Sequence, residues 1–257
     1  MSFVENKISK PSLSIEKYFE EYKLSIDDPE KFWSDKASSL SWIKNFSTVK
    51  ESTFNDDVNI KWFDGGSLNV SYNCIDRHLK ERGNKVAIIW EADTPNESKK
   101  ITYNDLHSEV CKFANGLKSL GVKKGDRVTI YLPMIPEAAY AMLACARIGA
   151  IHSVVFGGFA SNELASRIDD SKAKILVTAS CGFEPGRTVE YKPLVDEAIK
   201  IASHKIEKMI LFQRPGNEVK LNSPNEVSWE EVVSNAKDAD CVEMNSNEFA
   251  YILYTSG

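Results

Sequence analysis

After residue 83 the chain alternates between short apolar runs of strand length and longer segments with the periodicity of amphipathic helices. This order is typical of α/β proteins, in which helices connect parallel strands. The expected strands, rich in Val and Ile, lie at 86–90, 127–132, 151–156, 174–178 and 209–212. The expected helices lie at 102–120, 136–148, 161–170, 194–202 and 229–236. Because the strands are apolar at successive positions, we expect a mostly parallel sheet covered by helices.

Local signals indicate where several of these helices begin and end. Thr102 and Asp105 have the spacing of a capping box, and the helix that follows is expected to stop at Gly121. Pro136 can open the next helix, because a residue in the first turn needs no backbone N–H. Ser161 is expected to cap the helix that reaches about residue 170.

The first third of the chain has a different pattern. Residues 13–46 are helical in periodicity and rich in aromatic and charged side chains. So short a segment buries little surface by itself, which favours an extension packed against a larger body over an independent helical domain. A strand is expected at 58–63 and a helix at 72–82.

Charge and cysteine usage exclude several classes of protein. The 32 Lys and Arg against 37 Asp and Glu give a net charge of −5, so nucleic acid is not an expected partner. The five cysteines form no C-x-x-C pair, as expected for reduced thiols in a cytosolic protein. The first residues lack the apolar core of a signal peptide. The expected location is the cytoplasm.

One stretch, at 138–160, is apolar and long enough to span a bilayer. Arg147 lies in its middle, where a charged residue costs about 2.5–3.5 kcal/mol on insertion scales. The sequence therefore favours a buried helix through Ile148, a stop at Gly149 and a strand after it, with no membrane association.

The end of the chain carries a further pattern. Residues 249–254 read as a buried strand, and a turn begins directly after them. Because a core strand seldom precedes a natural carboxyl terminus, we expect the chain to be the front part of a longer protein.

Short segments after three expected strands could approach a ligand. The glycines of Phe156-Gly157-Gly158 permit close approach to a flat, uncharged group, although a plain tight turn explains them equally. The loop that ends in Glu184-Pro185-Gly186-Arg187 carries a cation suited to phosphate, or a solvated surface arginine. Thr255-Ser256-Gly257 offers hydroxyl and amide groups for phosphate, or an ordinary turn.

Signatures of the common nucleotide-binding loops, serine hydrolases and zinc peptidases are absent from the sequence. The four histidines show no metal-ligand spacing, so each is expected at the surface or behind a site, and no metal site is expected.

Longer blocks of sequence resemble the AMP-forming acyl-CoA synthetases. The residues from Tyr254 to Gly257 are similar to the start of the phosphate-binding loop of that superfamily. Within it, the blocks at 62–78, 87–91, 132–137, 141–150 and 152–159 resemble acetyl-CoA synthetases. The resemblance runs from about Tyr18 to the last residue, and ordered blocks of this length are a specific signal.

The resemblance implies an α/β fold that is an incomplete N-terminal domain of an adenylate-forming enzyme, with an N-terminal helical extension. It implies an extension at 14–72 and the first part of the AMP-binding domain at 73–257, truncated at the phosphate loop. The family's remaining phosphate loop, acyl pocket and lysine-bearing C-terminal domain are expected beyond residue 257.

The resemblance also implies a two-step ligase. Acetate and ATP form acetyl-adenylate and pyrophosphate, and the thiol of coenzyme A then displaces AMP, with Mg²⁺ neutralising the phosphates. The implied coenzyme A contacts are Phe156, Gly157, Gly158, Glu184, Pro185, Gly186 and Arg187. The implied contacts to the ATP phosphates are Thr255, Ser256 and Gly257. No catalytic residue is implied within the chain, which is expected to be inactive alone.

Two alternatives stay open. Many acetyl-CoA synthetases have Arg where this chain has Glu184, and the Glu-Pro-Gly-Arg form resembles the propionyl-CoA synthetases, so propionate or another short-chain acid is the alternative substrate. The alternative of another class is a non-catalytic binding or regulatory product. An unpaired apolar strand at the end of the chain would invite aggregation, which counts against that alternative.

Overall fold

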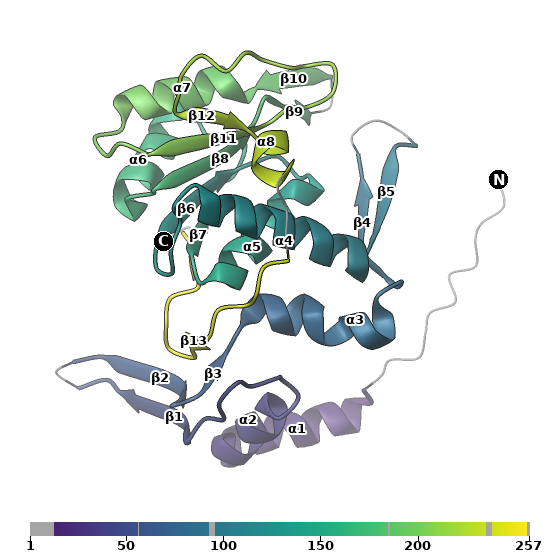
Figure 1. The fold of residues 1–257 in the computed structure, drawn as a ribbon. Helices are drawn as coiled ribbons and strands as arrows, with labels where there is room; N and C mark the ends of the chain where they lie inside the picture. The colour runs from purple at the N-terminus through teal and green to yellow at the C-terminus, as the bar shows by residue number, and fades with distance from the viewer. Residues whose placement is uncertain (1–12, 56, 93–95, 185, 235–237, 256–257) are drawn as a thin grey trace.

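The computed structural model describes residues 13–55, 57–92, 96–184, 186–234 and 238–255. Its main body is a six-stranded sheet in the order β12-β11-β8-β6-β7-β14, and all neighbouring strands in it are parallel (Figure 1). The strands are β6 (Arg127–Tyr131), β7 (Ile151–Val154), β8 (Ile175–Ala179), β11 (Lys208–Phe212), β12 (Glu226–Ser228) and β14 (Tyr251–Ile252). The predicted parallel α/β sheet is confirmed.

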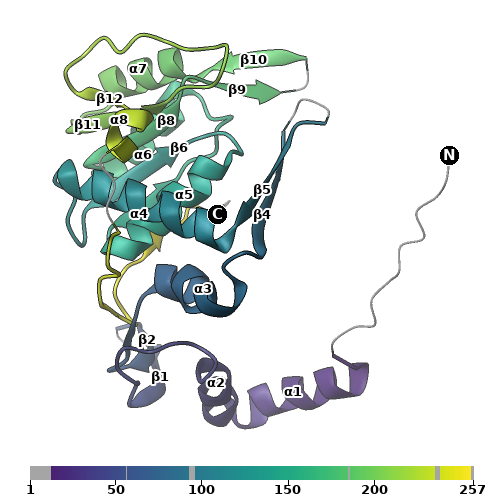
Figure 2. The ribbon, with the colours of Figure 1, turned by 45° about the vertical axis from the view of Figure 1, so that its right-hand side comes forward.

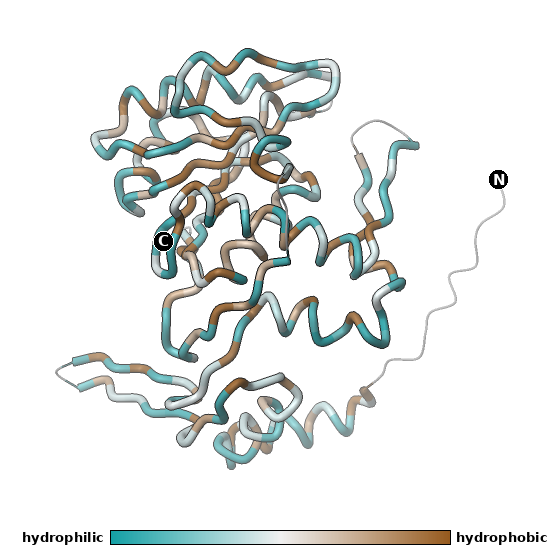
Figure 3. Tube along the Cα trace, in the orientation of Figure 1, coloured by the Kyte–Doolittle hydropathy of each residue, from teal (hydrophilic) through white to brown (hydrophobic). Residues whose placement is uncertain are grey.

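Helices cover both faces of this sheet (Figures 1 and 2). One face carries α4 (Tyr103–Ser119), α5 (Pro136–Ile148) and α8 (Trp229–Ser234), and the other carries α6 (Ser161–Ser171) and α7 (Tyr191–Ile201). Successive residues of a strand point to opposite faces, so Ile175 and Val177 of β8 enter the first core and Leu176 enters the second. This double burial explains the unbroken apolar runs, which Figure 3 shows along the central strands.

Helix ends follow the local signals in four of five places. Pro136 opens α5, and Gly121 directly follows Leu120, the C-cap of α4. Thr102 and Asp105 form the predicted capping box at the start of α4. Gly149 ends α5 with φ of +72°, a left-handed conformation that glycine adopts without strain. The prediction that Ser161 caps α6 is wrong: Ala160 is the N-cap, and no side chain caps the helix.

The N-terminal region lies below the sheet in Figure 1 and contains strands as well as helices. Its elements are α1 (Ile15–Asp27), α2 (Pro29–Ala37), β1 (Thr48–Thr53), β2 (Asn59–Asp64), β3 (Ser67–Leu68), a π-helix η1 (Tyr72–Asp76) and α3 (Arg77–Arg82). β1 and β2 form an antiparallel hairpin, and β3 pairs with β13 (Met244–Asn245). The β3–β13 pair therefore joins the beginning of the chain to residues near its end. The predicted boundary between 14–72 and 73–257 stays a prediction.

Two strand predictions need correction. β4 (Val86–Glu91) forms an antiparallel hairpin with β5 (Ser98–Thr102) outside the six-stranded sheet, as Figure 2 shows. The predicted buried strand at 249–254 is only the two-residue β14, and Phe249, Tyr251 and Leu253 are exposed. The cause is its place at the sheet edge, where β7 is its one strand partner among the residues described.

The apolar stretch at 138–160 is a buried helix, a glycine stop and a strand, as predicted. Across the described parts of the chain, no helix has both the length and the apolar character needed to cross a membrane. The side chain of Arg147 is buried in the interior of the protein, where it is only 4% exposed.

Candidate functional site

The carboxyl ends of β6, β7, β8 and β14 meet at one edge of the parallel sheet. In this architecture ligands bind at that edge. The segment Phe156–Phe159 follows β7, the segment Glu184–Arg187 follows β8 and Thr255 follows β14. The topology therefore brings the three predicted segments to the same edge of the sheet. Pro185, Ser256 and Gly257 lie outside the described residues.

Two tyrosines connect the first two segments. The hydroxyl of Tyr131, the last residue of β6, donates to the carbonyl oxygen of Phe159 at 2.7 Å and lies 3.2 Å from that of Gly157. Its ring centroid is 4.9 Å from that of Tyr191, at the start of α7. Burial, followed by the neighbouring Tyr191, raises the pKa of Tyr131 to about 12, so this phenol stays protonated as a donor. The sequence analysis missed both tyrosines, although Tyr131 ends a correctly predicted strand.

Glycines in the segments after β7 and β8 let the chain pack closely against the rings of Tyr191 and Phe156. A Cβ atom on Gly157 would lie 2.2 Å from the hydroxyl oxygen of Tyr191, and one on Gly182 would lie 2.9 Å from that atom. A Cβ on Gly158 would lie 2.6 Å from the ring of Phe156. The Phe156 side chain is 70% exposed, so its ring is open to a ligand.

The predicted loop at 181–187 is instead a β-hairpin of β9 (Cys181–Glu184) and β10 (Arg187–Glu190). Gly186 in its turn has φ of +79°, which explains why a glycine stands there. Arg187 faces Glu184 in the hairpin register, and its Nη2 and Nε atoms lie 2.6 and 2.7 Å from Glu184 Oε2. The Arg187 side chain is still 71% exposed, so a phosphate could reach its other donors.

A second arginine lies beside this hairpin and was missed by the sequence analysis. The guanidinium carbon of Arg214 lies 4.6 Å from the ring centroid of Phe183, and its backbone N–H donates to Ser180 Oγ. Arg214 is buried. It follows β11 at the same carboxyl edge, which is the signal that could have identified it.

Thr255 is held close to α6 through its neighbour Tyr254. The Tyr254 hydroxyl donates to the carboxylate of Asp170 on α6, and the guanidinium carbon of Arg167 lies 4.1 Å from the centre of the Tyr254 ring. Burial, then Asp170, raises the pKa of Tyr254 to about 12. The start of the predicted phosphate loop is thus tied to α6.

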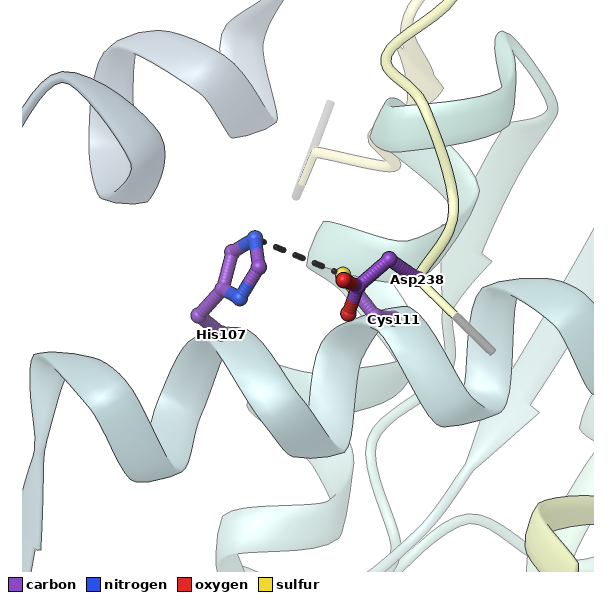
Figure 4. A group of neighbouring side chains, drawn as sticks. All are labelled: His107, Cys111 and Asp238. Atoms are coloured by element: carbon purple, nitrogen blue, oxygen red, sulfur yellow. Dashed lines mark hydrogen bonds between the residues drawn. The ribbon is translucent and has the colours of Figure 1, made fainter. Parts of the chain in front are cut away.

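A separate side-chain cluster lies away from this edge. His107 and Cys111 are one turn apart on α4, and the ligand atoms of His107, Cys111 and Asp238 lie within 4.8 Å of one another (Figure 4). His107 and Cys111 are four residues apart on one helix face, a spacing that was not recognised as a ligand pattern in the sequence. His107 Nε2 already lies 3.5 Å from Cys111 Sγ and 3.4 Å from Arg147 Nη2, and burial raises the pKa of the Cys111 thiol. A metal ion at this position would be repelled by the Arg147 guanidinium. The raised pKa of Cys111 would also oppose the deprotonation of its thiol that metal binding needs.

The guanidinium beside His107 belongs to Arg147, which is held by its own set of hydrogen bonds. Its Nη1 and Nη2 atoms each donate to Asp76 at 2.8 Å, and its Nε donates to the carbonyl oxygen of Ala239. Burial alone would raise the pKa of Asp76, but the hydrogen bonds and charge of Arg147 outweigh it and hold the pKa below its usual value. The group is therefore a structural ion pair linking η1, α5 and the chain before β13.

Comparisons with known protein families identify the family to which this chain belongs. A family model described as "AMP-binding enzyme" matches residues 75–257, which is well over half of the chain. The chain belongs to this family. A model described as "Acetyl-coenzyme A synthetase N-terminus" matches residues 18–74. The resemblance proposed from the sequence blocks is thereby confirmed.

Individual relatives are similar to this chain over nearly its whole length. It is 51% identical over 246 residues to an acetyl-coenzyme A synthetase from Yersinia pestis (strain Pestoides F), covering 94% of this chain and 38% of the relative. It is 48% identical over 259 residues to one from Bartonella quintana (strain Toulouse), covering 99% of this chain and 40% of the relative. The chain therefore spans about two fifths of the length of these relatives.

A solved structure, the acetoacetyl-CoA synthetase from Streptomyces lividans, has the same fold. It superposes with a TM-score of 0.82 at 23% identity, covering 91% of this chain and 35% of that one. This likeness confirms the predicted fold class.

Proposed function

We propose that the protein containing this chain is an AMP-forming acetate–CoA ligase. The observation that carries the proposal is the 51% identity, over 94% of the chain, to a protein named acetyl-coenzyme A synthetase. The substrates are then acetate, ATP with Mg²⁺, and coenzyme A, all small molecules, with no nucleic acid or membrane partner. A cytoplasmic location fits such substrates and the absence of C-x-x-C pairs among the cysteines.

In the proposed reaction a carboxylate oxygen of acetate attacks the α-phosphorus of ATP and pyrophosphate leaves. The thiolate of coenzyme A then attacks the acyl carbon of acetyl-adenylate, AMP leaves, and a thioester remains. Mg²⁺ enters with ATP and neutralises its phosphate charge. The part of the chain before residue 256 contributes binding groups, and the proposed ATP contacts are Thr255 with Ser256 and Gly257 beyond the described residues.

The proposed coenzyme A site combines the segments after β7 and β8. Its residues are Phe156, Gly157, Gly158, Glu184, Pro185, Gly186 and Arg187. The exposed ring of Phe156 offers a stacking surface for adenine, and the exposed guanidinium of Arg187 offers donors to phosphate. The hydrogen bonds of Tyr131 hold the first segment in place, which supports a preformed site.

Pyrophosphate exchange tests the proposal with the full-length protein. We expect exchange of pyrophosphate into ATP that depends on acetate, and thioester formation that also requires coenzyme A. Propionate at equal concentration serves as the rival acid, and a higher kcat/KM with propionate would reassign the substrate. The 257-residue chain alone is the second sample, and we expect no exchange from it.

A further inference from the structure

Arg167 on α6 contacts aromatic side chains from two segments that lie far apart in the sequence. Its guanidinium carbon lies 4.1 Å from the ring centre of Tyr254, next to Thr255, and 5.9 Å from the ring centre of Phe159. Both distances fall within the roughly 6 Å over which a cation is attracted to a ring face. One side chain therefore touches the entry to the proposed phosphate loop and the end of the segment after β7.

The groups around Arg167 leave its two ring contacts unoccupied. Its Nη1 atom lies 3.7 Å from Glu163 Oε2, one turn earlier on α6. The Arg167 side chain is 22% exposed, so part of its charge is withdrawn from water. Asp170, one turn later, accepts the Tyr254 hydroxyl. Tyr254 is thus held at its ring by Arg167 and at its hydroxyl by Asp170.

Tyr131 also holds the segment after β7, whereas backbone pairing gives the Tyr254 segment little support near the ligand-binding edge. β14 pairs with β7 through only two residue pairs, Tyr251 with His152 and Ile252 with Ser153. The pairing ends at Ile252, so Tyr254 is not part of the sheet. A side chain that spans both segments can set how they lie relative to each other.

We propose that Arg167 is a positioning residue that couples the start of the phosphate loop to the segment after β7. A change at Arg167 then disturbs both segments, whereas a change at Asp170 disturbs the phosphate-loop side alone. That these segments receive ATP and coenzyme A rests on the proposed function, but the coupling itself does not.

Amide hydrogen exchange of the full-length protein, measured without any substrate, tests the coupling. In Arg167→Gln we expect faster exchange at both 156–160 and 251–255. In Asp170→Asn we expect faster exchange at 251–255 only. Glu163→Gln is the matched control, since it removes the ion pair and keeps both ring contacts, and its exchange should equal wild type. Equal exchange in Arg167→Gln and wild type would overturn the proposal.

Steady-state kinetics of the full-length protein then connect the coupling to ligands. We expect Arg167→Gln to raise the KM for ATP and the KM for coenzyme A about two- to fivefold each, the factor that a cation–ring contact supplies, with little change in kcat or melting temperature. A lower melting temperature with both KM values unchanged would reduce Arg167 to a stabilising residue. A wild-type protein that uses neither ATP nor coenzyme A would refute the proposed function and leave the exchange result standing.

Discussion

At the scale of single residues, the pairing of Arg187 with Glu184 decides how the proposed phosphate contact works. The ion pair is exposed, so it contributes at most about 1 kcal/mol to stability. The ion pair matters because Glu184 competes with a phosphate for Arg187: the carboxylate that holds the guanidinium also occupies donors that a phosphate would use.

Substitutions at these two positions should therefore act in opposite directions. In the full-length protein, Arg187→Ala should raise the KM for coenzyme A and spare acetate-dependent pyrophosphate exchange. Glu184→Gln should lower that KM, because it frees the guanidinium. Initial-rate kinetics with varied coenzyme A measure both, and an unchanged KM in Arg187→Ala would remove that residue from the site.

The phenol of Tyr131 makes the stability of the chain sensitive to alkaline pH. Its pKa rises from about 10 to about 12 on folding, so between these values the folded state binds more protons than the unfolded chain. Stability must then fall as pH rises through this window. Tyr131→Phe, which does not ionise at this position, should lose less stability than wild type between about pH 10 and pH 12. Urea unfolding at each pH measures the two slopes, and parallel slopes would contradict this assignment.

At the scale of elements, local signals predicted helices well and strand partners poorly. The capping box of α4 depends on residues three apart, so the sequence alone contains it. The hairpins β4–β5 and β9–β10 pair segments that are adjacent in the sequence, but the residues of each strand do not show whether it pairs with its neighbour or joins the parallel sheet. An apolar run such as 86–90 has the same pattern in a hairpin as in a parallel sheet, because the run itself does not specify the strand with which it pairs.

Thr102 and Ser161 allow a paired test of the predicted helix caps, because Thr102 caps its helix and Ser161 does not. Thr102→Ala should destabilise the chain by about 0.5–2 kcal/mol, because it removes the hydroxyl that accepts from the Asp105 N–H. Ser161→Ala should change stability by less than about 0.5 kcal/mol, since no side chain caps α6. Chemical denaturation of both variants gives the comparison, and equal losses would show that Ser161 acts as a cap after all.

At the scale of the whole molecule, the candidate site follows from topology more than from any motif. The sequence placed Phe156, Glu184 and Thr255 after three strands, and parallel pairing then brings those strand ends to one edge. Residues that support the edge from elsewhere, such as Tyr191 and Arg167, could not be found in this way. Their roles depend on rings and carbonyls that come together only in the folded chain.

The same long-range contacts bear on the predicted division of the chain at residue 72. Asn69, before that point, donates to the carbonyl oxygens of Ala146, Arg147 and Val242. Just after it, Asp76 takes the two hydrogen bonds of the buried Arg147 guanidinium. A boundary crossed by such buried polar contacts is not a flexible linker.

We therefore expect the regions on both sides of residue 72 to unfold in one transition. Asp76→Asn should destabilise the whole chain by about 3–5 kcal/mol, because it leaves the buried Arg147 charge without its partner. Since the pKa of Asp76 is lowered on folding, the pair stabilises the chain above the ordinary pKa of aspartate, and this stability is lost as pH falls through the lower folded value. The stability gap between wild type and Asp76→Asn should accordingly narrow in acid. Calorimetry at neutral and acidic pH measures both effects, and two separate transitions in wild type would establish 14–72 as an independent unit.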